Sequence, residues 1–234
     1  YVFLICIVQR KKYTEVKITE VKMSDFNSLT ASELGDMIGQ GEIDPVELTE
    51  HFLLRIETSP IGKKIYSTVT SQLALEQAKD AKKRAISGRR LSSLDGVPIS
   101  WKDLFDIKGY PCEAGSELLA GRLANQNCAV YNFAEAQGLI CLGKTHMSEL
   151  AFSGLGLNPV RETPPCVNYP ESVPGGSSSG AATSVSFGLA AAGIGSDTGG
   201  SVRIPAAWND LVGFKTTAGK LSLDGVVPLC SRFD

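Results

Sequence analysis

From residue 96 onward, short apolar runs alternate with stretches of helical character, and this alternation constrains the fold more than any other feature. The strand-like runs lie in GVPISWKDLF, GLICLG, AAGIGSD and LVGFKTT. The helical stretches between them are NCAVYNFAEAQ and the small-residue segment SSSGAATSVSFGLA. Strands that alternate with helices are typical of an α/β protein, so we expect a central sheet with helices packed against it.

Three helices are predicted before this region. Thr30 and Glu33 have the spacing of a capping box, which predicts a helix ending near Gln40. Asp44 followed by Pro45 is a helix-start signal with a proline at the first helical position. A third helix, rich in alanine, lysine and glutamine, is expected over roughly residues 72–85. We expect these helices to form a layer without chemistry of its own.

Charge and cysteine usage exclude several function classes. The formal net charge of −2 gives no support to direct nucleic-acid binding. The chain has only two histidines, His51 and His146, and its six cysteines form no CxxC pair, so we expect no metal site. Scattered free thiols are typical of the reducing cytosol and predict a cytoplasmic protein. Structural roles are expected for both histidines.

We make separate predictions for the two ends of the sequence. The apolar run from Tyr1 to Val8 is too short to span a bilayer, so no membrane span is predicted. Met23 begins an ordinary globular segment, and we expect residues 1–22 to be a non-native or upstream tail. Residues 23–234 are expected to be the N-terminal part of a single domain whose sheet is incomplete at the C-terminus.

Two short motifs match known sites without their structural context. GLICLGKT, residues 138–145, fits the P-loop pattern, but its central residues have the character of a strand rather than a loop. GSSSG fits the nucleophile elbow and would make Ser178 the nucleophile. An elbow follows a strand directly, whereas the preceding residues here contain four prolines. We therefore expect neither a phosphate site nor an elbow.

The segment GIGSDTGGSVRIPAA is a stronger candidate for a catalytic site than either short motif. A glycine pair followed by Ser201 and a helix start can direct several backbone N–H groups at one point. Such an arrangement would form an oxyanion hole beside the Ser201 hydroxyl, although glycine-rich turns before helices also bind phosphates. With histidine disfavoured, a buried neutral lysine is the next candidate for the base. Lys102, Lys144 and Lys215 all follow apolar strands, and these patterns do not choose among them.

At this point the sequence resembles a known family. The segment GGSSSGAATSVSFGLAAAGIGSDTGGSVRIPAA resembles the amidase signature of serine amidases that use a Ser–cis-Ser–Lys triad. VPISWKD is similar to the family's lysine strand, and GKTHMSELAFSG to the segment before the serine loop. The resemblance runs from about Asn27 to the last residue and implies a mixed central sheet covered by helices on both faces. One departure is Ser179, where many members have glycine.

The resemblance implies a role for each matching position. It makes Ser201 the acylated nucleophile, Ser177 the relay serine after a cis peptide bond, and Lys102 the base. The backbone amides of Thr198, Gly199, Gly200 and Ser201 match the oxyanion hole. Ser178, Asp197 and Arg203 are supporting residues.

An amidase acting on carboxylic amide C–N bonds is therefore expected, without a metal or organic cofactor. The alternatives within the family are the A subunit of a glutamyl- or aspartyl-tRNA amidotransferase and an amidase like allophanate hydrolase. The expected partner is a small-molecule amide. A homodimer is compatible with the resemblance, as is a partner subunit if the chain is an amidotransferase. A nucleotide-binding module and an inactive fragment are the alternatives outside this activity.

Overall fold

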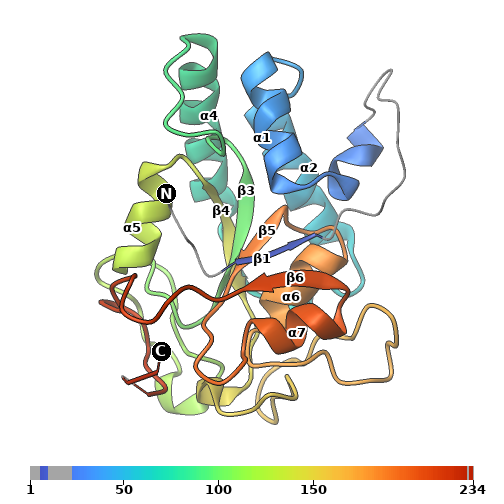
Figure 1. The fold of residues 1–234 in the computed structure, drawn as a ribbon, viewed down its shortest axis with the longest axis vertical. Helices are drawn as coiled ribbons and strands as arrows, with labels where there is room; N and C mark the ends of the chain where they lie inside the picture. The colour runs from blue at the N-terminus through green and yellow to red at the C-terminus, as the bar shows by residue number, and fades with distance from the viewer. Residues whose placement is uncertain (1–5, 10–22, 231, 234) are drawn as a thin grey trace.

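A computed structural model describes residues 6–9, 23–230 and 232–233 (Figure 1). The strands are β1 (Cys6–Gln9), β2 (Tyr66–Val69), β3 (Pro98–Lys102), β4 (Ile140–Thr145), β5 (Ala192–Ile194) and β6 (Leu211–Phe214). The α-helices are α1 (Ala31–Gln40), α2 (Pro45–Thr58), α3 (Gly62–Ile65), α4 (Ser71–Ile86), α5 (Ala129–Ala136), α6 (Ser179–Ser186) and α7 (Arg203–Trp208). Three 3-10 helices, η1 (Met23–Ser28), η2 (Glu117–Leu119) and η3 (Glu149–Ala151), lie in the connections.

The predicted helix starts are confirmed in the N-terminal part. The Thr30 hydroxyl accepts a hydrogen bond from the Glu33 N–H at 3.2 Å, and the Glu33 carboxylate accepts one from the Thr30 N–H at 2.9 Å. The Asp44 carboxylate accepts from the Val46 N–H at 2.8 Å, with Pro45 at the first position of α2. These bonds satisfy N–H groups that have no partner inside the helix, which fixes where each helix begins.

Six strands form one mixed sheet in the order β2-β4-β3-β5-β1-β6. Strand β3 is parallel to both β4 and β5, whereas β2 pairs antiparallel with β4. Because β3, β4 and β5 are parallel neighbours, their carboxyl ends meet at one edge of the sheet. The residues that follow these three strands are therefore brought together, although they are far apart in the sequence.

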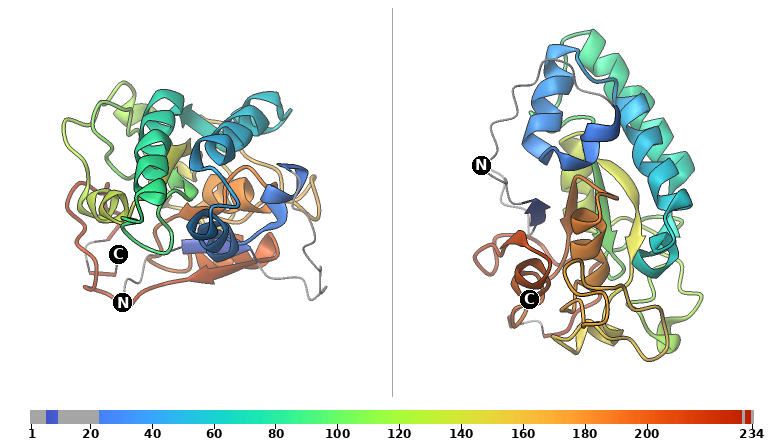
Figure 2. Two further views of the ribbon diagram at one scale, coloured as in Figure 1. Left: turned by 90° about the horizontal axis from the view of Figure 1, so that it is seen from above. Right: turned by 90° about the vertical axis from the view of Figure 1, so that its right-hand side faces the viewer.

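Helices cover both faces of the sheet, as consecutive residues of β3 show. The Ser100 hydroxyl lies 2.7 Å from that of Ser184 on α6. The next side chain, Trp101, packs against Tyr131 of α5 with ring centroids 5.2 Å apart. Successive side chains of a strand point to opposite faces, so α5 and α6 lie on opposite sides of β3. The views in Figure 2 show the remaining helices packed around the same sheet.

Strand β1 extends the sheet beyond the region in which sequence analysis predicted structure. Cys6–Gln9 pairs antiparallel with β5 on one side and with β6 on the other (Figure 1). Four residues of the segment expected to be a tail, residues 1–22, are thus part of the sheet. The rest of that segment, residues 1–5 and 10–22, lies outside the described residues.

Two further observations concern membrane-spanning helices and groups of metal ligands. None of the described helices combines the length and the apolar character that crossing a bilayer requires. Among the described residues, no group of three or more histidine, cysteine, aspartate or glutamate side chains is arranged to hold a metal ion.

Candidate active site

Lys102 is the last residue of β3, and its side chain is fully buried. Its side-chain nitrogen lies 2.6 Å from the Ser177 hydroxyl and 2.8 Å from the Ser196 hydroxyl. Ser177 comes from the loop before α6, and Ser196 from the turn after β5. The parallel pairing of β3 with β5 places the carboxyl ends of both strands together, which is why residues 94 positions apart in the sequence are in contact.

Ser177 lies at the end of an irregular segment, where a cis peptide bond joins it to Gly176. This is the bond geometry that the family resemblance implied. A side chain at Gly176 would not fit, because an added Cβ would lie 2.6 Å from the Gly156 nitrogen and 2.7 Å from the Ser148 hydroxyl oxygen. The Ser148 N–H also donates to the Ser177 carbonyl at 3.2 Å. Ser177 is therefore packed from several sides.

Ser201 lies in the turn between β5 and α7 and is buried, with 8% of its surface exposed. The Ser178 N–H donates to the Ser201 carbonyl at 3.1 Å. This bond joins the loop of the expected relay serine directly to the loop of the expected nucleophile. The three residues that the resemblance places in a triad thus come from β3, the loop before α6 and the turn before α7, and the fold brings these segments together.

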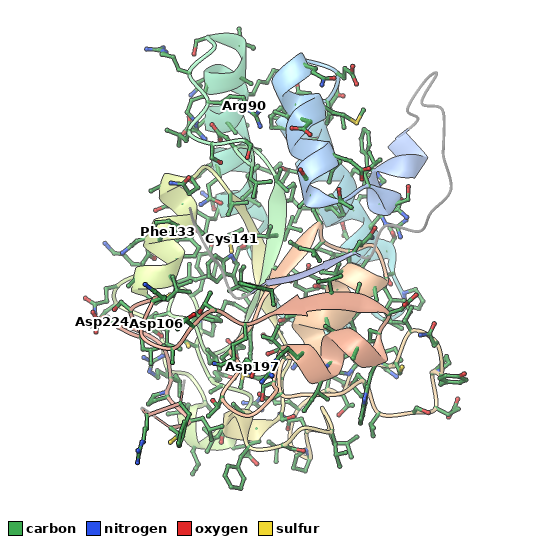
Figure 3. The ribbon with its side chains drawn as sticks, in the orientation of Figure 1. Arg90, Asp106, Phe133, Cys141, Asp197 and Asp224 are labelled. Atoms are coloured by element: carbon green, nitrogen blue, oxygen red, sulfur yellow. The ribbon has the colours of Figure 1, made fainter. Side chains whose placement is uncertain are left out.

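Asp197 holds the turn around Ser201. Its buried carboxylate accepts hydrogen bonds from the backbone N–H groups of Gly200 at 2.7 Å, Val202 at 3.1 Å and Arg203 at 3.2 Å. The Arg203 guanidinium adds a two-point contact at 3.0 and 2.9 Å. Burial opposes ionisation of Asp197, but the Arg203 side chain and the three N–H groups outweigh it and lower the pKa to about 2. Figure 3 shows Asp197 beside α7.

This arrangement bears on the Gly200 N–H, which the resemblance matched to an oxyanion hole. The Gly200 N–H is committed to Asp197 at 2.7 Å, and one N–H donates only one strong hydrogen bond. Among the residues that the structure describes, the N–H groups of Gly199 and Ser201 donate to no other protein atom. An added Cβ on Gly199 would meet nothing within 4 Å, so there is open space beside this part of the turn. Gly199 and Ser201 therefore remain as backbone donors, with Thr198 beside them.

The other two lysines make different contacts. Lys144, the fifth residue of β4, is buried and forms an ion pair with Asp103 at 2.9 Å. It also donates to the Pro111 carbonyl at 2.9 Å. Lys215 follows β6 and donates to the backbone carbonyl of Asp197. Of these three lysines, Lys102 is the one whose side-chain nitrogen contacts Ser177.

Neither histidine is placed to serve a serine. His51 lies on α2 between Phe26 and Phe52, with edge-to-face ring contacts at 5.5 and 5.6 Å. His146 follows β4, and its backbone carbonyl accepts from the Gly180 N–H at 2.9 Å. Burial lowers the pKa of both imidazoles. These contacts agree with the structural roles that we expected.

The two short motifs have the structures that sequence analysis favoured. In GLICLGKT, residues 140–145 form strand β4 rather than a phosphate-binding loop, and Lys144 is paired with Asp103. GSSSG is preceded by an irregular segment and not by a strand, so it is no nucleophile elbow. The Ser178 hydroxyl donates to the Ser196 carbonyl at 3.3 Å and does not cap α6.

Sequence analysis missed Ser196. Its hydroxyl is the second hydroxyl within 2.8 Å of the Lys102 nitrogen. The one signal for it is its position at the carboxyl end of the apolar run AAGIGSD, since this end of a parallel strand faces the site. That signal becomes specific only when β5 is known to be the neighbour of β3.

Comparisons with known proteins place this geometry in a family. The model of a family described as Amidase matches residues 47–234. The A subunit of the glutamyl-tRNA(Gln) amidotransferase from Acinetobacter baumannii is 37% identical over 215 residues, which are 91% of this chain and 43% of that protein. The corresponding protein from Anaeromyxobacter dehalogenans is 40% identical over 204 residues, which are 86% of this chain and 41% of the relative.

Solved structures agree with the family match. The peptide amidase of Stenotrophomonas maltophilia superposes with a TM-score of 0.79 at 30% identity, covering 85% of this chain and 42% of that one. A fatty acid amide hydrolase gives a TM-score of 0.79 at 25% identity, covering 90% and 37%. The chain therefore spans less than half the length of the relatives that it matches.

Proposed function

The chain belongs to the amidase family, and on this premise we propose that it is part of a serine hydrolase that cleaves the C–N bond of carboxylic amides. The observation that carries the proposal is the contact of the buried Lys102 side-chain nitrogen with the Ser177 hydroxyl at 2.6 Å. The hydrogen bond from the Ser178 N–H to the Ser201 carbonyl supports it, because it fixes the nucleophile loop beside the relay loop. A nucleotide-binding function loses its support, since the P-loop match is strand β4.

In the proposed acylation step, the Ser201 hydroxyl oxygen attacks the amide carbonyl carbon. Its proton passes to Ser177, whose own proton passes to neutral Lys102. The Gly199 and Ser201 N–H groups stabilise the negative charge on the carbonyl oxygen, since both are free to donate. The C–N bond then breaks, and the proton returns through Ser177 to the leaving nitrogen.

In the proposed deacylation step, water attacks the Ser201 ester along the same proton route in reverse. Lys102 again receives the proton through Ser177 and returns it to the Ser201 oxygen as the acid leaves. Asp197 and Arg203 take no part in the proton transfer in this scheme, and they act by holding the turn that presents Ser201.

The second candidate is the A subunit of an amidotransferase, which would hydrolyse glutamine as its amide. The identity of 37–40% to two such subunits favours it. Ammonia release from glutamine but not from aliphatic amides, together with co-purification of a second protein chain, would select this candidate. Preference for aliphatic or peptide amides would select a stand-alone amidase.

Two further parts of the proposal concern the chain as a whole. Residues 23–234 are proposed as the N-terminal part of one catalytic domain, because the family match runs to residue 234 while the relatives are more than twice as long as the matched region. A cytoplasmic location is proposed because five cysteines are free: Cys112, Cys128, Cys141, Cys166 and Cys230.

The test is covalent labelling with a fluorophosphonate, followed by tandem mass spectrometry to locate the adduct. The expected adduct is on Ser201, and Ser201→Ala is expected to abolish labelling. Ser178→Ala is the matched control, because Ser178 is also buried and lies beside the same turn. It should retain most of the labelling. An adduct on Ser178, equal losses in both variants, or no adduct on a folded chain would each contradict the proposal.

A further inference from the structure

Strand β1 lies between the two strands that flank the turn with Ser201 (Figure 1). Strand β5 ends at Ile194, the turn and α7 follow, and the chain then returns to the sheet as β6. Strands β5 and β6 are not neighbours, because β1 pairs antiparallel with both of them. They are thus two strand spacings apart, roughly 10 Å, which is too far for direct hydrogen bonds. Residues 6–9 therefore join the two strands across the sheet.

The pairing of β1 extends over the whole of both neighbouring strands. Residues 6–8 lie opposite residues 192–194, which are all three residues of β5. Residues 6–9 lie opposite residues 211–214, which are all four residues of β6. Among the described strands, β6 pairs only with β1. The attachment of β6 to the sheet therefore depends on residues 6–9.

Strand β6 packs closely against α7, the helix that follows the turn. A Cβ added to Gly213 would lie 3.0 Å from the Arg203 Cα and 3.0 Å from the Val202 carbonyl oxygen. These two residues are also the ones whose N–H groups donate to Asp197. A shift of β6 would therefore displace the backbone that follows Ser201.

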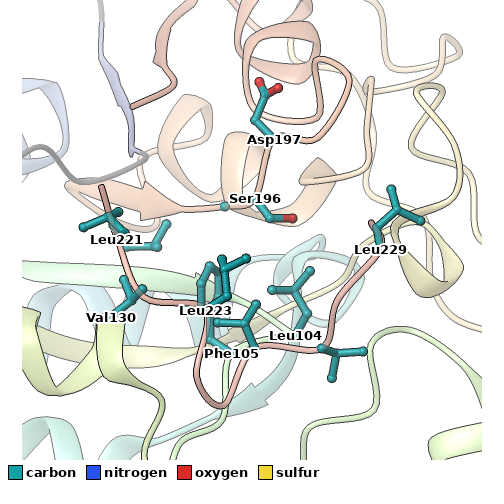
Figure 4. A pocket seen from close by; sticks show the side chains of 12 residues that line it. Leu104, Phe105, Val130, Ser196, Asp197, Leu221, Leu223 and Leu229 are labelled. Carbon is teal, nitrogen blue, oxygen red and sulfur yellow. The ribbon is translucent and has the colours of Figure 1, made fainter. Parts of the chain in front are cut away.

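The residues after β6 contact the other end of the turn. Lys215 donates a hydrogen bond to the backbone carbonyl of Asp197. Further along the chain, the segment 221–229 lines a small apolar cavity together with Ser196 and Asp197 (Figure 4). The Asp197 carboxylate points away from the leucines of this cavity and contacts Arg203. The chain from β6 onward thus contacts the turn at both of its ends.

Strand β1 is itself held by contacts outside the sheet. The Gln9 side-chain amide donates to the Asn27 carbonyl of η1 at 2.7 Å. Val8 is partly buried and packs against the main hydrophobic core. Residues 6–9 lie outside the region 47–234 that matches the family model, so the family assignment does not account for this strand.

We propose that residues 6–9 are a positioning element for Ser201: by holding β6 in the sheet, β1 fixes the turn that presents the nucleophile. This inference rests on the proposed function, in which Ser201 is acylated. The effect passes through β6, α7 and Asp197, and β1 takes no part in the proton transfer. A misplacement of about 1 Å at the reacting oxygen is enough to slow a reaction about 100-fold.

The first measurement is hydrogen–deuterium exchange in the full chain with Val8→Pro. Proline removes a strand N–H and is not tolerated inside a sheet, so β6 should lose its attachment. The N–H groups of residues 200, 202 and 203, which Asp197 holds, are expected to exchange at least about tenfold faster. Helix α4 is the internal reference, because it packs on β4 and α2, and its exchange should stay unchanged.

Two control variants accompany Val8→Pro. Val8→Ile keeps both the N–H and the branched side chain and should behave as the wild type. Val69→Pro places the same substitution on β2, at the opposite edge of the same sheet, and should leave exchange in the turn unchanged. If Val8→Pro does not fold, Val8→Gly replaces it, since glycine keeps the N–H and weakens the strand less, and the same local effect is expected at a smaller size.

The rate and the extent of fluorophosphonate labelling separate positioning from unfolding. Val8→Pro should label completely but about 10- to 100-fold more slowly, because the turn is displaced in every molecule. Reduced labelling at the wild-type rate, unchanged exchange in the turn, or an equal increase in the turn and in α4 would each overturn the inference. Exchange in the turn that depends on Val8, in a chain whose Ser201 is never labelled, would instead overturn the proposed function alone.

Discussion

The Asn209 side-chain amide donates to the Pro174 carbonyl at 2.7 Å, and this bond ties the end of α7 to the loop that carries Ser177. The same amide donates to the Pro205 carbonyl at 2.8 Å, and its oxygen accepts from the Val167 N–H at 3.0 Å. Asn209 is 1% exposed. One buried side chain therefore links the loop that carries Ser177, the helix α7 and the proline-rich segment before them.

Asn209→Ala is expected to lower the free energy of unfolding by roughly 2–4 kcal/mol, because it leaves buried backbone groups without partners. Fluorophosphonate labelling of Ser201 should slow as well, since the relay loop loses its link to α7. Urea denaturation and labelling rates measure the two effects. Asn132→Ala, at an exposed position of α5, is the control and should change neither. A variant as stable as the control would refute this role of Asn209.

Lys102→Met is expected to slow the labelling of Ser201 by at least about 100-fold, the usual contribution of a general base. Methionine keeps much of the length of the lysine side chain, so the loss should come from the missing amine. The measurement is the labelling rate at saturating probe, with far-UV circular dichroism to confirm folding.

Lys79→Met is the control for a lysine that is exposed on α4, and it should label at the wild-type rate. A wild-type rate for Lys102→Met, with a large loss in Lys215→Met, would show that the base lies at a different strand end from the one proposed.

The buried ion pair of Lys144 and Asp103 is expected to affect the free energy of unfolding. Lys144→Met should cost about 3–5 kcal/mol, because it leaves the Asp103 carboxylate buried without its cation. The double variant Asp103→Asn/Lys144→Met should cost less than the sum of its two single variants, since no uncompensated charge remains. Denaturant melts of the four proteins measure this coupling.

An exposed ion pair serves as the comparison for that cycle. Lys83 and Asp80 are 2.8 Å apart on α4, with side chains that are 76% and 62% exposed. Lys83→Met should have little effect on unfolding, because water and salt screen such pairs. If the losses in unfolding free energy of the single variants Lys144→Met and Asp103→Asn add up to the loss of the double variant, the buried pair is not coupled.

The lowered pKa of Asp197 predicts that the folded chain loses stability in acid. Its pKa is lowered to about 2 in the folded chain, from an ordinary value near 3.8, so ionised Asp197 stabilises the fold above pH 4. This contribution, on the order of 2 kcal/mol, should be lost as the pH falls from about 4 to 2. The stability difference between the wild type and Asp197→Asn should therefore shrink over that range.

The measurement is the free energy of unfolding by urea at pH 5, 4, 3 and 2. Asp36→Asn, at an exposed position of α1, controls for the general effect of removing a carboxylate. A constant difference between wild type and Asp197→Asn across these pH values would contradict the shifted pKa.

Local signals in the sequence determined several elements well. The caps at Thr30 and Asp44 fixed the starts of α1 and α2, because the residues that satisfy the first N–H groups are neighbours in the chain. Apolar runs located β3, β4 and β5, whose residues are all buried and therefore form continuous apolar stretches, and also the partly exposed β6. The irregular segment before Ser177 was equally predictable from its prolines.

The strand order was decided only by tertiary structure. Lys102, Lys144 and Lys215 have the same local pattern; the family resemblance pointed to Lys102, and in the structure its side-chain nitrogen contacts Ser177 and Ser196. Strand β2 was missed because its sequence, YSTV, has no continuous apolar run, and β1 was missed because its apolar run lies in the segment that was expected to be a tail.

Tertiary structure also decided the hydrogen bonds within the turn that carries Ser201. The sequence by itself determined that a glycine-rich turn with Ser201 precedes a helix, since glycine and serine there favour such a turn. It could not show that Asp197 takes the Gly200 N–H, because a hydrogen bond depends on where the carboxylate points after the turn has folded. The preferences of neighbouring residues thus determine where helices and strands form. Contacts between distant segments determine which backbone N–H groups and side chains remain available to act on a substrate.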